Sequence, residues 1–259
     1  MIPAIRFWLT AILVFCGSGL QVACGSGDSQ TPQDAAPNNG ANIMPLGDSI
    51  TEASAGLPTY RYFLWQWAEQ KGYPINLVGS RSGTAYGPPL YPDFDMDHEG
   101  HSGWRADELL AQIASRASAS VPDIVLLHAG HNDLCQGQDV PSTVEDVAGI
   151  IDALRELNPR IAIVLAQLIA SADPCHVLIP TLNAQLPVLA EAKTTPESPV
   201  VGQDMFSGFD PPTMTFDGVH PNATGEAFMA DRWAIHLAPL LERVFASKSR
   251  RRIVTRRRP

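Results

Sequence analysis

Short apolar runs alternate with segments of helical periodicity through the central part of the chain. Five runs are short enough for strands, and they occupy residues 42–47, 75–79, 123–129, 161–167 and 199–202. Helical patterns occupy residues 59–71, 106–117, 144–157, 181–193 and 224–244. The run DIVLLHA at 123–129 is apolar and β-branched enough to be buried on both faces. The alternation predicts an α/β fold, a three-layer sandwich in which a parallel sheet of about five strands lies between two layers of helices.

Polar motifs mark the ends of these predicted elements. GDS (47–49) follows the first strand, GHSGW (100–104) lies in the loop before the second helix, GHND (130–133) follows the third strand, and DGVHP (217–221) precedes the last helix. In an open α/β sheet, the residues that carry chemistry collect at the carboxyl ends of the strands. These four segments are therefore candidates for a functional site.

The four segments contain the parts of a nucleophilic site. A serine hydroxyl is a weak nucleophile until a base removes its proton, and His220 is the candidate base for Ser49. Asp217, three residues before the histidine, can hold the imidazole in the required tautomer. Taken alone, each residue has a simpler interpretation, since Ser49 fits a helix N-cap, Asn132 a turn and His220 a helix start. The joint arrangement favours the catalytic interpretation.

At this point the sequence resembles a known family. The four blocks, with Ser, Gly, Asn and His in this order, resemble the SGNH hydrolases, also called the GDSL esterase/lipase superfamily. The stretch DHEGHSGW (97–104) resembles a narrower group, the family 3 carbohydrate esterases that include acetylxylan esterases. The resemblance covers about residues 42–245. It implies a flavodoxin-like fold and a catalytic triad of Ser49, Asp217 and His220.

The same resemblance implies an oxyanion hole, a set of donors for the charge that develops on the substrate oxygen. Its members are the N–H of Ser49, the N–H of Gly100 and the side chain of Asn132. Gly103 is an alternative to Gly100, because two glycines lie in one short loop. The chain departs from the family pattern at His131, where a small residue is usual.

The function implied is that of a secreted serine esterase that removes short acyl groups, above all acetyl, from a carbohydrate such as xylan. An acetylated polysaccharide or a small ester would be its partner, and no cofactor or metal is expected. A lipase or thioesterase would use the same residues on longer acyl chains, and a non-catalytic carbohydrate-binding protein would keep the fold without turnover. No G-x-S-x-G elbow occurs in the chain, which disfavours the α/β-hydrolase fold.

A zinc hydrolase is an alternative of different chemistry. One short segment is rich in metal-ligating residue types, namely Asp95, Asp97, His98, Glu99 and His101. Its two histidines are separated as His-Glu-Gly-His and not as in the H-E-x-x-H motif of zinc proteases. The spacing therefore does not support this alternative.

Charge is distributed unevenly along the chain. The formal net charge is −9, yet SKSRRRIVTRRRP (247–259) holds seven basic residues and no acidic one. The rest of the chain holds 11 of the 18 basic residues and all 27 acidic ones. An acidic body argues against nucleic acid as a partner. We expect residues 247–259 to be a disordered basic tail and the protein to be a monomer.

The N-terminal residues predict export. Residues 1–24 carry one Arg, a short apolar stretch (FWLTAILVF) and small residues, as in a signal peptide, and the stretch is too short to span a bilayer. LQVAC (20–24) resembles a lipoprotein box with Gln21 where Leu is usual, so lipidation at Cys24 and plain secretion both remain open. Only such an anchor would bring the protein to a membrane. Residues 25–41 predict a disordered linker before the hydrolase domain, 42–246.

Two cysteines remain in the body of an exported chain. Cys135 follows the third predicted strand and Cys175 follows the fourth. If those strands are parallel neighbours, both cysteines emerge at the same end of the sheet. Because export permits disulfides, we expect the two to form one beside the site.

Overall fold

The computed structural model describes residues 40–256, with side-chain burial for residues 40–250. The predicted signal at 1–24, the lipidation candidate Cys24 and nearly all of the predicted linker lie outside these residues. Within the described part, no helix is both long and apolar enough to cross a membrane.

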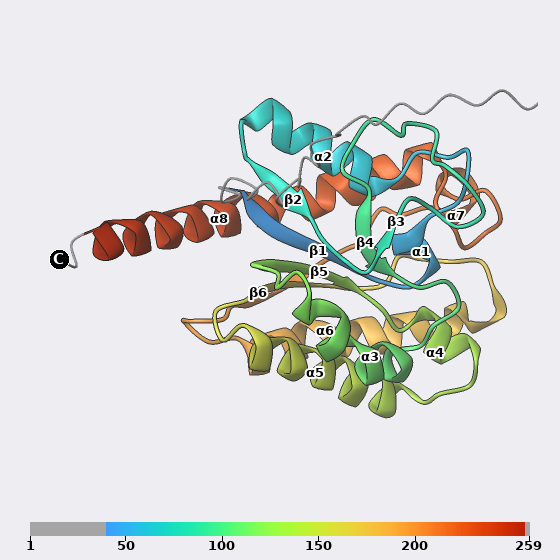
Figure 1. Cartoon of the computed structure of the whole chain (residues 1–259). Helices are drawn as coiled ribbons and strands as arrows, with labels where there is room; N and C mark the ends of the chain where they lie inside the picture. Colours follow the sequence, from blue (N-terminus) through green and yellow to red (C-terminus); the bar gives the residue numbers. More distant parts are fainter. Residues whose placement is uncertain (1–39, 257–259) are drawn as a thin grey trace, which may run out of the picture. The chain divides into compact units, whose positions relative to one another are not determined.

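A largely parallel sheet forms the centre of the domain (Figure 1). Its strand order is β3-β4-β1-β5-β6-β7, with β2 also paired to β1, and only β3 runs antiparallel to its neighbour. The strands are β1 (Ala41–Gly47), β2 (Ile75–Leu77), β3 (Arg81–Ser82), β4 (Asp97–Gly100), β5 (Ile124–His128), β6 (Ala162–Ala166) and β7 (Val200–Gln203). The predicted α/β sandwich with a mainly parallel sheet is confirmed.

The sheet has seven strands where the sequence predicts about five. Two strands pair with the same edge of β1. β2 pairs with Ala41–Ile43 at its start, and β4 pairs with Leu46 and Gly47 at its end. The chain thus leaves the sheet after β3 and returns as β4 beside the carboxyl end of β1. Both additional strands, β3 and β4, are short and polar, so no apolar run marks them in the sequence.

Helices cover both faces of the sheet (Figure 1). α2 (Tyr60–Lys71) and α8 (Ala223–Arg256) lie on one face, and α3 (Ala106–Ser118), α5 (Val140–Leu157) and α6 (Ile179–Lys193) lie on the other. Side chains alternate along each central strand. In β5, Ile124 and Leu126 belong to the core under α2 and α8, whereas Val125 and Leu127 belong to the opposite core.

Local signals in the sequence set the bounds of α2. The Thr59 hydroxyl accepts a hydrogen bond from the N–H of Tyr62 at 3.1 Å, which satisfies a donor of the first turn. Gly72 ends the helix with φ of 71°, a left-handed conformation that glycine adopts without a Cβ penalty. The predicted helix at 59–71 is therefore confirmed to within one residue.

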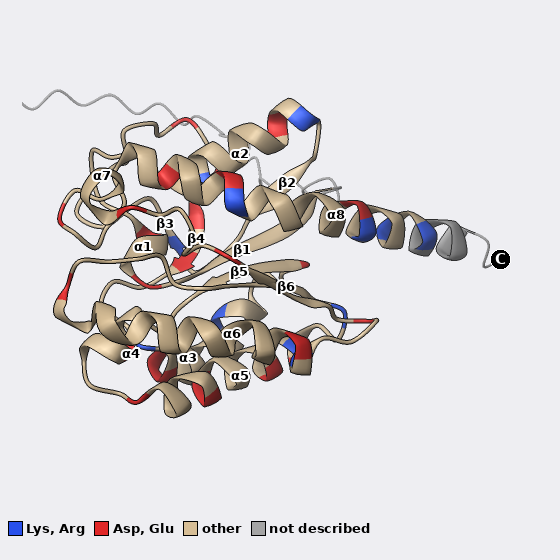
Figure 2. Cartoon of the chain, turned by 180° about the vertical axis from the view of Figure 1, so that it is seen from behind, with Lys and Arg blue, Asp and Glu red and all other residues tan. Residues whose placement is uncertain are grey.

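The last helix extends beyond its predicted end. α8 continues to Arg256, so residues 247–256 differ from the disordered tail expected there. The Lys248 ammonium donates to the carbonyl of Gly40 at 2.7 Å and to the Asp123 carboxylate at 2.6 Å, which ties this part of the helix to the sheet. Figure 2 shows the basic residues following one another near the C-terminal end of α8, where the helix dipole favours cations.

Candidate active site

Ser49 lies at the carboxyl end of the central strand β1, as the first residue of the short helix α1 (Ser49–Glu52). The Asp48 carboxylate accepts a hydrogen bond from the N–H of Ile50 at 2.9 Å and so caps α1. A Cβ at Gly47 would lie 2.2 Å from the carbonyl oxygen of His128, so only glycine fits beside β5. The Gly-Asp-Ser motif thus turns the chain sharply and leaves the serine at the carboxyl end of the sheet.

The structure brings Ser49, Asp217 and His220 together across 171 residues of sequence. The Nε2 atom of His220 lies 2.9 Å from the hydroxyl of Ser49, and its Nδ1 lies 2.7 Å from the Asp217 carboxylate. The other carboxylate oxygen of Asp217 accepts the backbone N–H of His220 at 2.7 Å. Partial burial acts to raise the pKa of Asp217, but hydrogen bonds from His220 outweigh it and hold this pKa below 3.8.

These side chains line a pocket of about 530 Å³. Residues from all four sequence motifs contribute to it, with Ser49 from the first, Ser102 and Gly103 from the second, His131 and Asn132 from the third, and Asp217, Val219 and His220 from the fourth. Tyr86 and Phe216 line it as well, and no sequence pattern singled them out. The expected meeting of the motifs is therefore found at the carboxyl ends of β1, β4 and β5.

Gly100 does not occupy the position expected for an oxyanion-hole donor. It ends β4 and does not line the pocket, and its N–H donates to Nδ1 of His98 at 2.9 Å. Burial lowers the pKa of His98 to about 2, so the ring stays neutral and can accept this bond. A Cβ at Gly100 would lie 2.5 Å from the backbone nitrogen of Glu52, so close packing against α1 requires the glycine.

Gly103, the alternative, does line the pocket. It has a left-handed φ of 81°, and nothing in the described part of the chain accepts a hydrogen bond from its N–H. The Asn132 side chain also faces this pocket and donates one amide hydrogen to the carbonyl of Trp104 at 2.9 Å. An amide group has two hydrogens, so one remains for a ligand.

A buried carboxylate that the sequence did not reveal fixes this loop. Glu52, at the end of α1, is 3% exposed. One of its oxygens accepts the N–H of Ser102 at 2.8 Å and the Ser102 hydroxyl at 2.5 Å, and the other pairs with Arg81. The residue thereby links the helix that carries Ser49 to the loop that carries Gly103.

Asp133 fixes the other side of the same loop. Its buried carboxylate accepts the N–H of Ala106, the first residue of α3, at 3.0 and 3.1 Å. Desolvation raises the pKa of Asp133 to about 6, while the bond from Ala106 opposes this rise. The third motif therefore holds the start of α3 next to the pocket.

The residues that suggested a zinc site do not converge on one point. Glu99 binds His101 at 2.5 Å and Ser80, and the His101 ring stacks on Trp104 with ring centres 4.2 Å apart. Within residues 40–250, the one group whose ligand atoms lie within 4.8 Å of one another comprises His131, Cys135, Asp173 and Cys175. Its two sulfur atoms are bonded to each other, so they are not available as thiolate ligands in this state.

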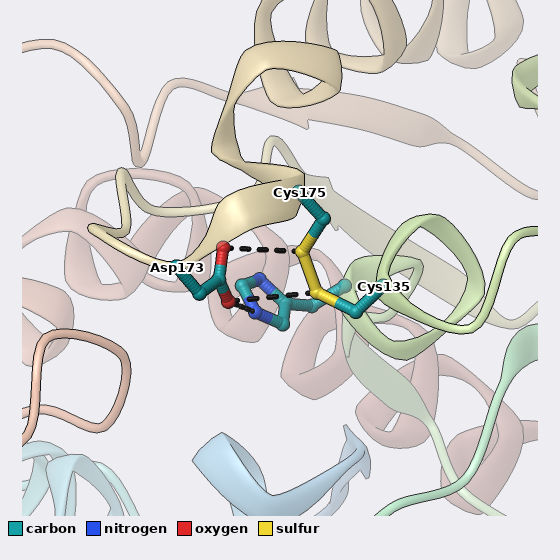
Figure 3. Close-up of side chains that lie close together, drawn as sticks. Cys135, Asp173 and Cys175 are labelled. Carbon is teal, nitrogen blue, oxygen red and sulfur yellow. Dashed lines mark hydrogen bonds and ion pairs between the residues drawn. A yellow bond between two sulfur atoms is a disulfide. The ribbon is translucent and has the colours of Figure 1, made fainter.

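The predicted disulfide between Cys135 and Cys175 is present (Figure 3), and Cys135 lines the pocket. It joins α4 (His131–Cys135) to the 3₁₀ helix η1 (Pro174–Leu178), with Cα atoms 5.0 Å apart. Asp173 lies beside it and accepts a bond from Nε2 of His131 at 2.6 Å. His131, the departure from the family pattern, is thus held against η1.

Comparisons with known proteins agree with this geometry. Residues 46–228 match the model of the GDSL-like Lipase/Acylhydrolase family. A multidomain esterase of Ruminococcus flavefaciens is 30% identical over 216 residues, which make up 74% of this chain and 28% of that protein. The chain thus spans little more than a quarter of the length of this curated relative.

Two solved structures have the same fold. An acetyl esterase variant with an acetate ion has a TM-score of 0.71 and 31% identity, over 79% of this chain and 99% of that one. A family 3 carbohydrate esterase from Talaromyces cellulolyticus also has a TM-score of 0.71 and 31% identity, over 78% and 98% of the two chains. The predicted resemblance is confirmed, and because the family model matches well over half of its length, the chain belongs to the GDSL-like lipase/acylhydrolase family.

Proposed function

We propose that this protein is a serine esterase that removes acetyl groups from a carbohydrate through an acyl-serine intermediate. The proposal depends on two hydrogen bonds of His220. Its Nδ1 lies 2.7 Å from the Asp217 carboxylate, and its Nε2 lies 2.9 Å from the Ser49 hydroxyl. A neutral imidazole in this position can take the hydroxyl proton, while the carboxylate stabilises the imidazolium that forms.

In the first half of the reaction, the Ser49 oxygen attacks the ester carbonyl and its proton passes to Nε2 of His220. The carbonyl oxygen becomes an oxyanion, which we assign to the N–H groups of Ser49 and Gly103 and the amide of Asn132. Each such donor contributes about 3 kcal/mol of transition-state stabilisation. The carbon–oxygen bond to the alcohol then breaks, and the alcohol leaves with the proton from His220.

In the second half, a water molecule gives a proton to His220 and attacks the acyl carbon. The bond to Ser49 breaks, the serine regains its proton from His220, and the carboxylic acid is released. One histidine therefore serves as base and acid in both halves, which requires Nε2 to remain within reach of the serine oxygen.

Two findings support a carbohydrate as the alcohol component. The similar solved proteins are described as an acetyl esterase and a family 3 carbohydrate esterase. In addition, the side chains of His220 and Asp217 are 31% and 41% exposed, so the triad is open to an ester carried on a large polymer.

We further propose that the protein acts outside the cytoplasm, either freely secreted or anchored through Cys24. The signal-like pattern at 1–24 supports export. The disulfide between Cys135 and Cys175 supports it independently, because disulfides persist mainly in oxidising compartments.

Assays on the purified protein test the function. We expect hydrolysis of 4-nitrophenyl acetate and release of acetate from acetylated xylan, with rates that fall steeply as the acyl chain lengthens. Ser49→Ala should lower kcat at least about a thousandfold, because the covalent step is lost. Equal rates for the wild type and Ser49→Ala would exclude the mechanism, and faster hydrolysis of long-chain esters would identify a lipase or thioesterase instead.

A further inference from the structure

A second hollow of about 300 Å³ lies beside the active-site pocket. The two hollows share Ala85, Tyr86 and Ser102 as common lining. The rest of the second hollow is lined by Glu52, Arg81, His101, Trp104 and Arg116. A ligand with its ester at Ser49 can therefore extend from one hollow into the other past Tyr86.

Tyr86 is presented to solvent on a fixed turn. Its side chain is 97% exposed, and its φ of 67° is a left-handed conformation that non-glycine residues rarely adopt. Ala85 is paired with the end of α1 by backbone bonds to Ala53 and Ala55 at 3.1 and 3.0 Å. Strained residues that are held in place in this way cluster at ligand sites.

The exposure of Tyr86 distinguishes it from other aromatic residues nearby. Tyr91, a few residues further on, stacks on Tyr62 with ring centres 4.6 Å apart, so its ring contributes to packing. The ring of Tyr86 makes no aromatic contact within the described part of the chain. A broad apolar face beside a catalytic pocket is therefore left for a ligand.

Two arginines that line the second hollow supply hydrogen-bond donors. The guanidinium of Arg116 lies 5.2 Å from the centre of the Trp104 ring, and this ring stacks in turn on His101. Arg81 pairs with Glu52 through one nitrogen and is 45% exposed, so its other donors are open to the hollow. Guanidinium groups present several N–H donors in a fixed plane, which suits a ligand rich in oxygen acceptors.

A hollow lined by both an exposed aromatic ring and several donors suits a pyranose unit, which has C–H faces and hydroxyl edges. We propose that the second hollow is a subsite for the sugar next to the acetylated one, with Tyr86 as its stacking platform. This inference rests on the proposed function, because it assumes that the alcohol component of the ester is a carbohydrate chain.

Binding tests the subsite without turnover. In the Ser49→Ala background, titration calorimetry with unacetylated xylo-, manno- and cello-oligosaccharides should reveal saturable binding of at least one of them. Adding Tyr86→Ala should weaken that binding by about tenfold, whereas Tyr86→Phe, which keeps the ring, should bind within about twofold of the parent. Ile235→Ala, an exposed residue of α8 outside both hollows, is the control and should bind unchanged.

Kinetics separate this inference from the proposed function. In Tyr86→Ala, the ratio of kcat/KM on an acetylated oligosaccharide to that on 4-nitrophenyl acetate should fall about tenfold, mainly through a higher KM. An equal loss on both substrates, or no saturable binding of any oligosaccharide, would overturn the subsite while leaving the esterase intact. Failure of the wild type to hydrolyse 4-nitrophenyl acetate would instead reject the proposed function.

Discussion

Glu52 ties the nucleophile's helix to the loop that carries Gly103. Because its carboxylate accepts both the N–H and the hydroxyl of Ser102, it fixes where the next N–H in the chain points. The residue touches no reacting atom in the proposed mechanism, so we regard it as a positioning residue. Its effect should appear in the transition state, where the oxyanion needs donors at set positions.

We expect Glu52→Ala to lower kcat for 4-nitrophenyl acetate by about a hundredfold, because a displacement of about 1 Å at the donors is enough for such a loss. Glu52→Gln keeps an oxygen that can accept hydrogen bonds from Ser102, so its kcat should be about tenfold higher than that of Glu52→Ala. Steady-state kinetics check this, with thermal unfolding of each variant as the control for folding. An unchanged kcat in Glu52→Ala would show that the loop holds its position without the carboxylate.

Glu226, in the first turn of α8, is a buried carboxyl outside the pocket. Burial raises its pKa from 4.5 to about 8, against the opposing effect of the bond from the N–H of Tyr60. A carboxyl with a raised folded pKa keeps its proton in the folded state after the unfolded chain has lost it. It therefore stabilises the fold at low pH, and this contribution is lost as the pH rises towards about 8.

Replacing Glu226 with Gln removes this titration while keeping an oxygen for Tyr60. Between about pH 5 and pH 8, we expect the free energy of unfolding of the wild type to fall relative to Glu226→Gln, by up to ~1.4 kcal/mol per pH unit. Urea unfolding of both proteins across this range measures the difference. Parallel pH profiles would show that Glu226 titrates at an ordinary value.

Site residues that belong to short motifs could be predicted from the sequence, whereas residues whose partners are distant along the chain could not. Ser49, Asp217 and His220 stand in recognisable local motifs, and the presence of all the motifs together predicts that these residues meet. Gly100 and Gly103 lie close together in the sequence, which does not show that Gly100 ends β4 and donates its N–H to His98. Glu52 could not be assigned, because its partners are 29 and 50 residues away along the chain.

Among the elements, apolar periodicity identified the central strands but not β3 and β4. A strand that pairs with only two residues of β1 needs no apolar run, and β4 reads Asp-His-Glu-Gly. The end of α8 was missed for a related reason. A run of basic residues indicates a solvated segment, whereas the bonds from Lys248 to Gly40 and Asp123 depend on the folded sheet.

The disulfide joins α4, which lines the pocket, to η1. It closes a loop of 40 residues between α4 and η1, and constraining a loop of this size in the unfolded chain contributes up to about 4 kcal/mol. The double variant Cys135→Ser, Cys175→Ser should therefore lose up to about 4 kcal/mol in urea unfolding. Reductant should destabilise the wild type similarly and leave the double variant unchanged. A wild type insensitive to reductant under unfolding conditions would argue against the bond.

For the molecule as a whole, charge distinguishes the acidic body from the basic end at 247–259. A neutral sugar ester would be recognised through hydrogen bonds and aromatic contacts and not through charge. The two hollows supply such hydrogen-bonding groups and aromatic faces. Lys248 and Arg250, at the end of α8, line neither hollow.

The export that we propose concerns the whole molecule, because it links the N-terminal residues to the disulfide beside the pocket. Expressed from Met1 to Pro259 in a bacterial host, the protein should lose its first residues. Its mature form should contain the Cys135–Cys175 bond, because export takes it out of the reducing cytoplasm. Mass spectrometry of the mature N-terminus separates two routes, since a lipid-modified Cys24 indicates anchoring and an unmodified start elsewhere indicates free secretion. A Cys24→Ser variant serves as the matched control, because it should block only the first route. An intact Met1 on a protein whose two body cysteines are both alkylated without reductant would contradict export by either route.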